Sequence, residues 1–495
     1  MYDDRLWILG NPAIRSLWPL GRVLAAGSGT VLAGRPLLSL SFALDYALGG
    51  EAPWSYHATN LAVHVLAALV LFGLVRRTLE GMPGLVAEPL DRGLFSLSVA
   101  ALWALHPLQT EAVTYVSERA ESLAGLAYLL VVYGFARGAR SPRPAPWYGL
   151  SVGACLLGCA TKEVIATAPL VVLAYDRTFV SRGLREALAS HRLLYAGLAG
   201  SWIALAWLSP GVGHRGIGFG YGYSWWSYAL TEGWVVGHYL MLCAWPFPLV
   251  FDYGAEPVAY LGDVLPWCAL IAALAAVTAL GTARRAAWGF LLLAFFALLA
   301  PSSSVVPVAF EPMAEHRMYL PLAPVVTLLV WGAWAWRGRR GLHLCLGLGL
   351  VSGGVTWLRN ADYRSETVLW ADTVLRRPDN PRARLALGDA LLREGRWAEA
   401  AREYGAAERI RPGNTDARLG LSRALTGMGR PDRALEVLRT TASDPGSASR
   451  LHDAAGRALE SMGRADLAAL EYAASLRSEP ADAEALSGLA RTRRP

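Results

Sequence analysis

The chain has 495 residues, of which 54% are hydrophobic and only 17% are charged. Long apolar runs with few charges recur between residues 56 and 358, so the composition indicates a multi-pass membrane protein and argues against a water-soluble enzyme. The net charge of +7 does not indicate nucleic-acid binding, because the arginines lie in short clusters between the apolar runs, as they do in membrane proteins.

The chain opens with the sequence MYDDRLWILGNP, which places an acidic pair, Asp3 and Asp4, before any apolar segment. No signal peptide is predicted, because no hydrophobic region precedes these carboxylates. We expect residues 1–55 to form an N-terminal outer loop that carries the acidic pair.

Ten apolar runs predict the membrane-spanning helices of a domain over residues 56–358. Several are shorter than the roughly 20 residues that a straight crossing needs, so 146–160 and 163–175 are interpreted as a helical hairpin. The stretch 230–245 is expected to lie at the membrane interface, with two helices there as the alternative. The ten runs are 56–75, 94–106, 120–137, 146–160, 163–175, 193–208, 263–283, 287–300, 319–336 and 342–358.

Basic residues predict the orientation of these helices, because loops retained in the cytoplasm carry an excess of Arg and Lys. Alternate loops on one side hold fifteen basic residues, and the opposite loops after residue 55 hold four: Arg119, Lys162, Arg215 and Arg317. The first 55 residues weaken this contrast without reversing it, since they add four arginines to the poorer side. The richer loops, which are predicted to be cytoplasmic, are 76–93, 137–145, 177–192, 284–286 and 337–341.

After residue 364 the sequence becomes rich in Ala, Arg, Glu, Leu and Asp with helical periodicity. Prolines recur at positions 378, 412, 445 and 480, at intervals of 34, 33 and 35 residues. This period is typical of tetratricopeptide repeats, whose small residues let two antiparallel helices approach closely. Residues 365–495 are therefore predicted to form three repeats and part of a fourth. Consensus positions are occupied by Gly388, Ala400, Tyr404, Ala407 and Pro412, and again by Gly456, Ala468, Tyr472 and Pro480.

The ionisable residues of the membrane part gather in segments that share the predicted outer face: HPLQTEAVTYVSERAE (106–121), TKE (161–163), FDYGAEP (251–257) and FEPMAEHRMYLP (310–321), together with the N-terminal YDD. Charges at membrane depth cost several kcal/mol unless they are paired or line a polar cavity. We therefore expect these segments to form one site, although any single pair among them is better explained as an interfacial salt bridge.

Lys162 stands out among these residues because it is the only lysine in the chain, and the other 45 basic residues are arginine. A lysine kept at an apolar segment indicates a specific task, and snorkelling at a helix end is the alternative. Arg and Lys side chains bind phosphate while a carboxylate takes a proton from an attacking hydroxyl, so the set predicts a site for an anionic phosphate carrier.

The sequence resembles the transmembrane and tetratricopeptide repeat-containing (TMTC) proteins. The resemblance is carried by RPLLSLSFALDYALGG, YHATNLAVHVLAAL, HPLQTEAVTYVSERAESL, YALTEGWVVGHYLMLCAWPFPLVFDY and EPMAEHRMYLP, followed by the repeats. These proteins are similar to the GT-C glycosyltransferases. The resemblance implies an all-α fold of about 10–11 membrane helices followed by a tetratricopeptide α-solenoid. It also implies transfer of a mannose-like sugar from a polyprenyl-phosphate carrier to an acceptor hydroxyl, expected to be on protein, at the non-cytoplasmic face.

By the same resemblance, Asp3 or Asp4 is the catalytic carboxylate, with a slight preference for Asp3. The relatives have a transmembrane helix before this pair, so the resemblance implies that the sequence lacks the first helix of the family. Contacts to the carrier phosphate and the acceptor are expected from residues in the later outer segments, namely Glu111, Arg119, Lys162, Glu163, Glu315, His316 and Arg317.

We expect no cofactor and no metal, because the sequence shows no compact ligand set and the lipid-phosphate sugar is a substrate. The expected partners are the carrier lipid, a protein or peptide acceptor held by the repeats, and membrane lipid, with no nucleic acid. The expected location is a bacterial inner membrane. The main alternative function is a non-enzymatic membrane scaffold that binds partners through the repeats, and a transporter is the third.

The orientation gives a topology prediction. A reporter fused after Arg340 is expected to behave as cytoplasmic, and one fused after Pro495 as exported, because the repeats follow the last crossing. Protease protection of the two fusions in sealed cells measures this. Repeats that face the cytoplasm would contradict the single-site interpretation, since the bilayer would then separate them from the charged segments.

Overall fold

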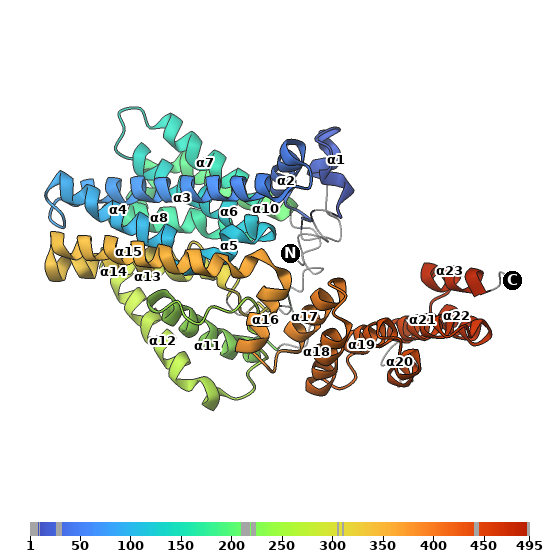
Figure 1. Cartoon of the computed structure of the whole chain (residues 1–495). Coiled ribbons are helices and arrows are strands. Elements are labelled where there is room, and N and C mark those ends of the chain that lie inside the picture. Colours follow the sequence, from blue (N-terminus) through green and yellow to red (C-terminus); the bar gives the residue numbers. More distant parts are fainter. Residues whose placement is uncertain are drawn as a thin grey trace. The chain divides into compact units, whose positions relative to one another are not determined.

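A computed structural model of the chain shows a protein built of helices (Figure 1). The structure describes residues 8, 10–25, 32–208, 218, 224–303, 306–308, 311–439 and 445–492. These residues form α-helices and short 3-10 helices and no β-strand, which confirms the predicted all-α class. Asp3 and Asp4 lie outside the described residues.

The chain divides into two compact units. The first comprises Met1–Leu249 and Ala255–Tyr363, and the second comprises Val250–Gly254 and Arg364–Pro495. The predicted boundaries at residues 55, 358 and 365 remain a prediction of domain organisation. Each unit packs around its own buried residues.

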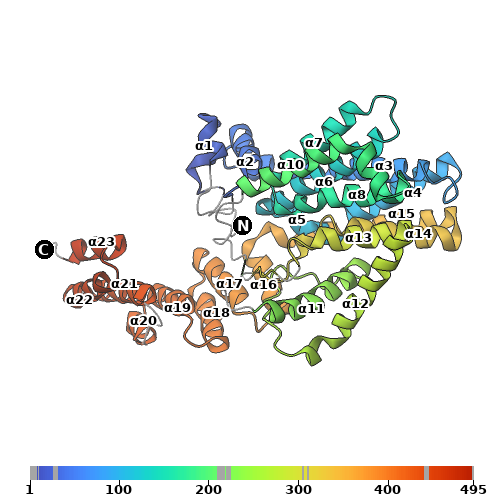
Figure 2. The same ribbon diagram turned by 180° about the vertical axis from the view of Figure 1, so that it is seen from behind.

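Eleven α-helices of the first unit correspond to the apolar runs predicted from the sequence, including the stretch assigned to the interface. Helix α3 packs against α4 and α6, α15 packs against α4, and α7 packs against α6 and α10 (Figures 1 and 2). These eleven are α3 (Pro53–Glu80), α4 (Pro89–Leu105), α6 (Arg119–Gly138), α7 (Ala145–Cys159), α8 (Ala168–Phe179), α10 (Arg192–Leu208), α11 (Trp225–Ala244), α12 (Leu261–Ala283), α13 (Ala287–Leu299), α14 (Leu322–Arg337) and α15 (Arg339–Asn360).

Within the described residues, three helical segments are long and apolar enough to cross a membrane: Pro53–Glu80, Leu261–Ala283 and Arg339–Arg364. A fourth is added if Glu163–Phe179 and Leu184–Ser190, which are bent by 112°, count as one span. The other apolar helices are shorter than a straight crossing requires. The ten crossings therefore remain a prediction. The shorter apolar helices are Pro36–Gly49, Ala145–Cys159, Arg192–Leu208, Ala287–Leu299 and Leu322–Arg337.

The segment expected to be an N-terminal loop contains helices α1 (Leu20–Leu24) and α2 (Pro36–Gly49). Pro36 at the first position of α2 suits a helix start, because its fixed φ is helical and its missing N–H has no partner there anyway. Leu38 and Phe42 on α2 are buried against Tyr56 of α3 and against residues at the start of α6. The outer position of this segment stays a prediction, and the sequence analysis did not identify its apolar helix face as a packing surface.

Short turns connect the helices at the end of the first unit where the polar segments lie. The segment between α4 and α6 forms η3 (Pro107–Gln109), α5 (Thr110–Thr114) and η4 (Val116–Glu118). Two further 3-10 turns, η5 (Glu163–Thr167) and η7 (Glu315–Met318), precede α8 and α14. Helix α4 ends before Pro107, because a proline disfavours helical geometry in the residue that precedes it.

The second unit begins with α16 (Glu366–Arg376) and continues as three helical hairpins and a single helix α23 (Ala483–Thr492). Glycines at the repeat positions accept the tyrosine rings: a Cβ on Gly388 or Gly420 would lie within 2.8 Å of the Tyr404 ring. The ring of Tyr472 lies in the same way between Gly456 and Gly488. The hairpins are α17 (Pro381–Arg393) with α18 (Trp397–Ile410), α19 (Thr415–Gly427) with α20 (Pro431–Leu438), and α21 (Pro445–Ser461) with α22 (Ala465–Ser478).

The acidic segment FDYG does not join the predicted site. Val250–Gly254 belongs to the second unit, where Asp252 forms an ion pair with Arg382 and its carbonyl accepts a hydrogen bond from Asn380 Nδ2 at 3.1 Å. The Phe251 ring contacts Trp370, with 5.1 Å between centroids. The expectation of one site from five segments is corrected for this segment, because its counter-charge is an arginine of the first repeat.

Candidate functional site

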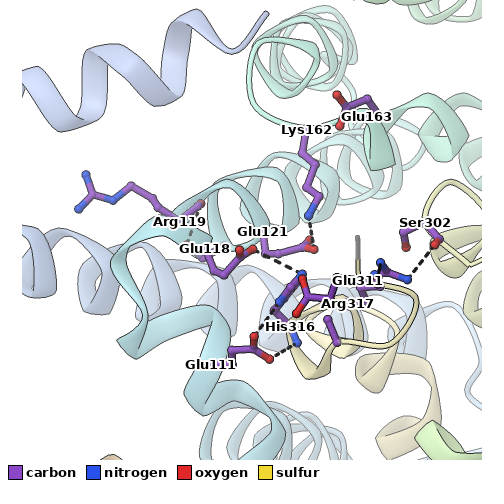
Figure 3. A network of polar contacts seen from close by, with 12 residues as sticks. Glu111, Glu118, Arg119, Glu121, Lys162, Glu163, Ser302, Glu311, His316 and Arg317 are labelled. Atoms are coloured by element: carbon purple, nitrogen blue, oxygen red, sulfur yellow. Dashed lines mark hydrogen bonds and ion pairs between the residues drawn. The ribbon is translucent and has the colours of Figure 1, made fainter. Parts of the chain in front are cut away.

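Three of the predicted polar segments meet at one end of the first unit (Figure 3). His316 on η7 lies between two carboxylates. Its Nδ1 is 2.9 Å from Glu111 Oε1, its backbone N–H donates to Glu111 Oε2 at 2.9 Å, and its Nε2 is 3.6 Å from Glu118 Oε2. The imidazole thus links the turns between α4 and α6 to the turn before α14.

Lys162 completes this group. Its Nζ lies 2.5 Å from Glu121 Oε1, in the first turn of α6. The sequence left open whether Lys162 pairs with Glu163 or with another carboxylate of the outer face, and the structure selects Glu121. We call Glu111, Glu118, Glu121, Lys162 and His316 the charge cluster.

The charge cluster is a network in which each ionised group stabilises the next. Burial disfavours protonation of His316, but Glu118 and Glu111 outweigh it and raise the pKa of His316 to about 10. Burial likewise disfavours ionisation of Glu118, but the positive charges of His316 and Lys162 lower its pKa. At neutral pH both groups are therefore charged.

Neighbouring helices hold η7 in place. The Tyr239 hydroxyl on α11 bonds to both the N–H and the C=O of Ala314, at 2.9 and 2.8 Å. Trp103 Nε1 on α4 donates to the carbonyl of Tyr319 at 2.8 Å. Because these three bonds fix the backbone on each side of η7, they hold His316 in position beside Glu111.

The predicted contact Glu163 lies beside the charge cluster and pairs with a residue that the sequence had not singled out. Arg35 Nη2 is 3.1 Å from Glu163 Oε2. Four charged side chains at this end of the unit are partly exposed: Lys162 by 17%, Glu163 by 30%, Glu118 by 22% and Arg35 by 14%. The accessible cations are thus Lys162 and Arg35.

Arg119 was predicted to contact substrate, and the structure places it elsewhere. Its side chain is completely buried, with Nη1 2.5 Å from Asp45 Oδ2 and Nε donating to Asn60 Oδ1 at 2.6 Å. Its guanidinium also lies 4.4 Å from the centroid of the Phe42 ring. Arg119 therefore ties α2 and α3 to the start of α6, and the prediction of a direct contact is corrected to a positioning role.

Arg317 and Glu315 are also buried. Arg317 donates to the carbonyls of Ser302 at 3.0 Å and Pro312 at 2.8 Å, so it holds the loop before η7. Glu315 is 2% exposed on η7. Arg317 lies 4.0 Å from Glu232 on α11, a buried carboxylate that the sequence analysis missed. Its only signal was its place in the motif YALTEGW, where an acidic residue interrupts an apolar stretch.

Comparison with known proteins places this geometry in context. The Tetratricopeptide repeat family matches residues 391–458. Protein O-mannosyl-transferase Tmtc2 of Drosophila melanogaster is 34% identical over 209 residues, which cover 39% of this chain and 21% of that protein. Protein O-mannosyl-transferase TMTC1 of Mus musculus is 34% identical over 194 residues, which cover 36% of this chain and 20% of that protein.

This chain is homologous to the TMTC proteins. The matched part spans about a fifth of the length of these TMTC relatives. Among solved structures, the crystal structure of ArnT from Cupriavidus metallidurans bound to undecaprenyl phosphate matches with a TM-score of 0.39 and 15% identity, over 88% of this chain and 76% of that chain.

The buried pair of Arg119 and Asp45 leads to a stability prediction. Arg119→Met is expected to lower the free energy of unfolding by about 3–5 kcal/mol, because it leaves the Asp45 carboxylate buried without its counter-charge. Thermal melting of the purified protein in detergent measures this. The matched control is Arg76→Ala, which removes an exposed pair with Glu80 and should cost less than about 1 kcal/mol. Equal melting of the two variants would contradict the positioning role.

Proposed function

We propose that the chain is a membrane glycosyltransferase. It moves a mannose-like sugar from a polyprenyl-phosphate carrier to a hydroxyl of a protein acceptor, at the non-cytoplasmic face of a bacterial inner membrane. The observation that carries this proposal is the charge cluster, in which buried and partly exposed carboxylates and cations from separate elements meet at one end of an apolar helical unit. The relatives named protein O-mannosyl-transferases support the reaction class.

Lys162 and Arg35 are suited to bind the phosphate of the carrier. Both are partly exposed, and an ammonium or guanidinium beside a phosphate stabilises the negative charge that develops when the sugar leaves. Among the described residues Lys162 has Glu121 as its partner, which leaves two of its three N–H donors for a ligand. The carboxylates keep the cations in position before the substrate arrives.

The reaction also needs a base. The acceptor oxygen attacks the anomeric carbon of the sugar, its proton passes to a carboxylate, and the carrier phosphate leaves. Asp3 or Asp4 is proposed for this step on the strength of the family resemblance. Glu118 and Glu111 have a different task, since they hold His316 in its charged form beside the site.

An apolar cavity in the first unit suits the lipid part of the carrier. It lies between α3, α6, α8, α13 and α14, and its lining includes Leu71, Leu74, Leu129, Leu291 and Leu320. Leu320 lies four residues after His316 in the chain, and Met82 and Leu85 of the same lining belong to the predicted cytoplasmic loop 76–93, so the lining extends from near the charge cluster toward the opposite side. Isoprenoid units are as apolar as this lining and as the surrounding lipid, so they would occupy the cavity without desolvation of a polar group.

Lys162 provides the direct test of this function. Lys162→Met is expected to abolish sugar transfer from a polyprenyl-phosphate mannose while the protein still inserts and melts normally, because methionine keeps the apolar stem and removes the charge. Lys162→Arg should be partly defective, since a planar fork does not replace a compact point charge in a tight site. Radiolabelled sugar incorporation in membranes measures both.

The control for this experiment is Arg340→Met, which removes an exposed cation from the predicted cytoplasmic side. Its transfer should match that of the unaltered protein. Full activity in Lys162→Met would favour snorkelling as the account of this residue. Absence of transfer in the unaltered protein, with a partner still captured by the repeats, would favour the scaffold alternative.

Metal dependence is a separate prediction. Glu118, Glu121 and His316 offer ligand atoms within 4.8 Å of one another, so this end of the unit has the composition of a possible ion site. His316 lies between Glu111 and Glu118, and a metal ion would have to displace a proton from the imidazole to use it as a ligand. Because Lys162 also supplies positive charge to Glu121, we propose that the cluster works without an ion.

Transfer is therefore expected to survive treatment with EDTA within about twofold of the untreated rate. The measurement is sugar incorporation before and after chelation, followed by readdition of Mn²⁺, Mg²⁺ or Zn²⁺. A loss that one of these ions restores would show that the three residues hold a metal after all.

A further inference from the structure

The third repeat carries polar side chains at two positions that are apolar in earlier repeats. Leu385, Leu419 and Asp453 are spaced by 34 residues, and Asp453 is as deeply buried as Leu419, at 3% exposure. Ser475 likewise takes the place of Ala407, two repeats earlier, and both are fully buried. A carboxyl group in place of a leucine lowers stability unless it is hydrogen-bonded. The two replacements therefore indicate a function other than packing.

The partner of Asp453 is a second carboxyl group. Asp453 and Asp482 hydrogen-bond to each other. Asp482 precedes α23, and its Oδ1 accepts from two backbone N–H groups of that helix, at 2.9 and 3.1 Å. The N-caps of α17 and α19 in the earlier repeats are Asn380 and Asn414, which carry no charge. We call Asp453 and Asp482 the carboxyl pair.

The hydrogen bonds around the carboxyl pair require a proton. Ser449 Oγ donates to Asp482 Oδ2 at 2.9 Å and lies 2.8 Å from Ser475 Oγ. Two ionised carboxylates cannot bond to each other, because both are acceptors only. Asp482 already accepts from two N–H groups and a hydroxyl, so its ionised form is stabilised. The shared proton therefore belongs to Asp453.

Few positive charges compensate the carboxyl pair. Arg457 lies one turn after Asp453 on α21 and pairs with Glu484 of α23. Helix α20 packs on α21 through apolar residues, including Leu435 and Leu438. Other charged groups of the packed helices pair elsewhere, as His452 with Glu471, Arg450 with Asp416 and Arg491 with Glu460, or are exposed, as Arg423, Asp432, Arg433 and Glu436.

Protonation of Asp453 depends on pH in a range near neutrality. Burial and the hydrogen-bonded neighbour Asp482 raise the pKa of Asp453 to about 6. Its contribution to stability is therefore greatest at low pH and is lost as the pH rises through about 6. Burial disfavours ionisation of Asp482, but the Ala485 N–H and Ser449 lower its pKa. Its opposite contribution therefore changes only below the ordinary aspartate pKa of about 3.9.

Helix α23 is the element that this change affects. It has 10 residues, and a helix of that length is marginal without tertiary packing. Its buried residues are Ala485, which packs with Leu459 and Tyr472, and Gly488, which contacts the Tyr472 ring. Such a small interface opens locally at a low free-energy cost. Docking of α23 thus depends strongly on its cap at Asp482.

We propose that the carboxyl pair is a pH-sensitive switch that controls the docking of α23 on α21 and α22. When Asp453 is protonated, it donates to Asp482 and links α21 to the start of α23. When the proton leaves to solvent, two like charges face each other in a buried place and α23 undocks more often. This switch belongs to the repeat unit and does not depend on sugar transfer.

The test measures hydrogen–deuterium exchange by mass spectrometry on the full chain in nanodiscs, between pH 5 and 8. Protection factors are corrected for the intrinsic pH dependence of amide exchange. Peptides from α23 are expected to lose protection by about tenfold between pH 5 and 7 and to change little from pH 7 to 8, because Asp453 is then fully ionised. Peptides from α17 serve as the internal reference and should stay constant.

Two variants isolate the proton of Asp453. Asp453→Asn should keep α23 protected at pH 7 to the level of the unaltered chain at pH 5, because the amide retains a donor and cannot ionise. Asp453→Leu restores the residue of the earlier repeats and should also remove the pH response. The matched control is His452→Gln, which removes the adjacent histidine that titrates in the same range and should leave the full response.

Four results would overturn the proposal. Constant protection of α23 from pH 5 to 7 would remove the switch. An unchanged pH response in Asp453→Asn would show that another group titrates, and loss of the response in His452→Gln would identify that group as the histidine. Recovery of protection at pH 7 on addition of millimolar Ca²⁺ or Mg²⁺ would assign the carboxyl pair to a cation instead of a proton.

Discussion

The cost of removing charge from water governs the organisation of the first unit. An ion buried in a helical bundle must find a counter-charge or several hydrogen bonds, because desolvation of each group costs several kcal/mol. Every buried cation described at the end of this unit meets that condition. Arg119 has Asp45, His316 has Glu111 and Glu118, and Arg317 has a set of loop carbonyls. The turns at this end exist in their observed arrangement because these pairs hold them.

Exposure then divides the charged residues by task. Arg119 and Arg317 are almost completely buried and use their donors on the protein itself, so they shape the site. Lys162, Arg35 and Glu118 keep part of their side chains accessible and stand where a ligand can reach them. The buried ion pairs pre-organise the accessible ones, which is the condition for stabilising charge in a transition state without rearrangement.

The sequence was sufficient for features that depend on local periodicity. The apolar runs located the helices, and the 34-residue period located the repeats, because both patterns are written in neighbouring residues. Ion pairs between residues far apart in the sequence could not be predicted in this way. Arg119 pairs with Asp45, which lies 74 positions earlier, and is therefore buried rather than available for the predicted contact. Asp252 pairs with Arg382, which lies 130 positions later, and therefore belongs to the repeat unit. Charge alone signalled that a partner was needed, without saying which one.

The contrast between Arg119 and Lys162 accounts for the single lysine of the chain. Arg119 serves Asp45, Asn60 and the Tyr56 carbonyl at once, which requires the several donors of a rigid guanidinium. Lys162 approaches one carboxylate oxygen of Glu121 at 2.5 Å and keeps its other donors for a ligand. A planar fork at this position would engage the carboxylate through two nitrogens and leave less of its charge accessible. Arginine therefore suits the structural pairs of this protein, and the compact ammonium of Lys162 is held by one carboxylate oxygen while, under the proposed function, its other donors face the substrate.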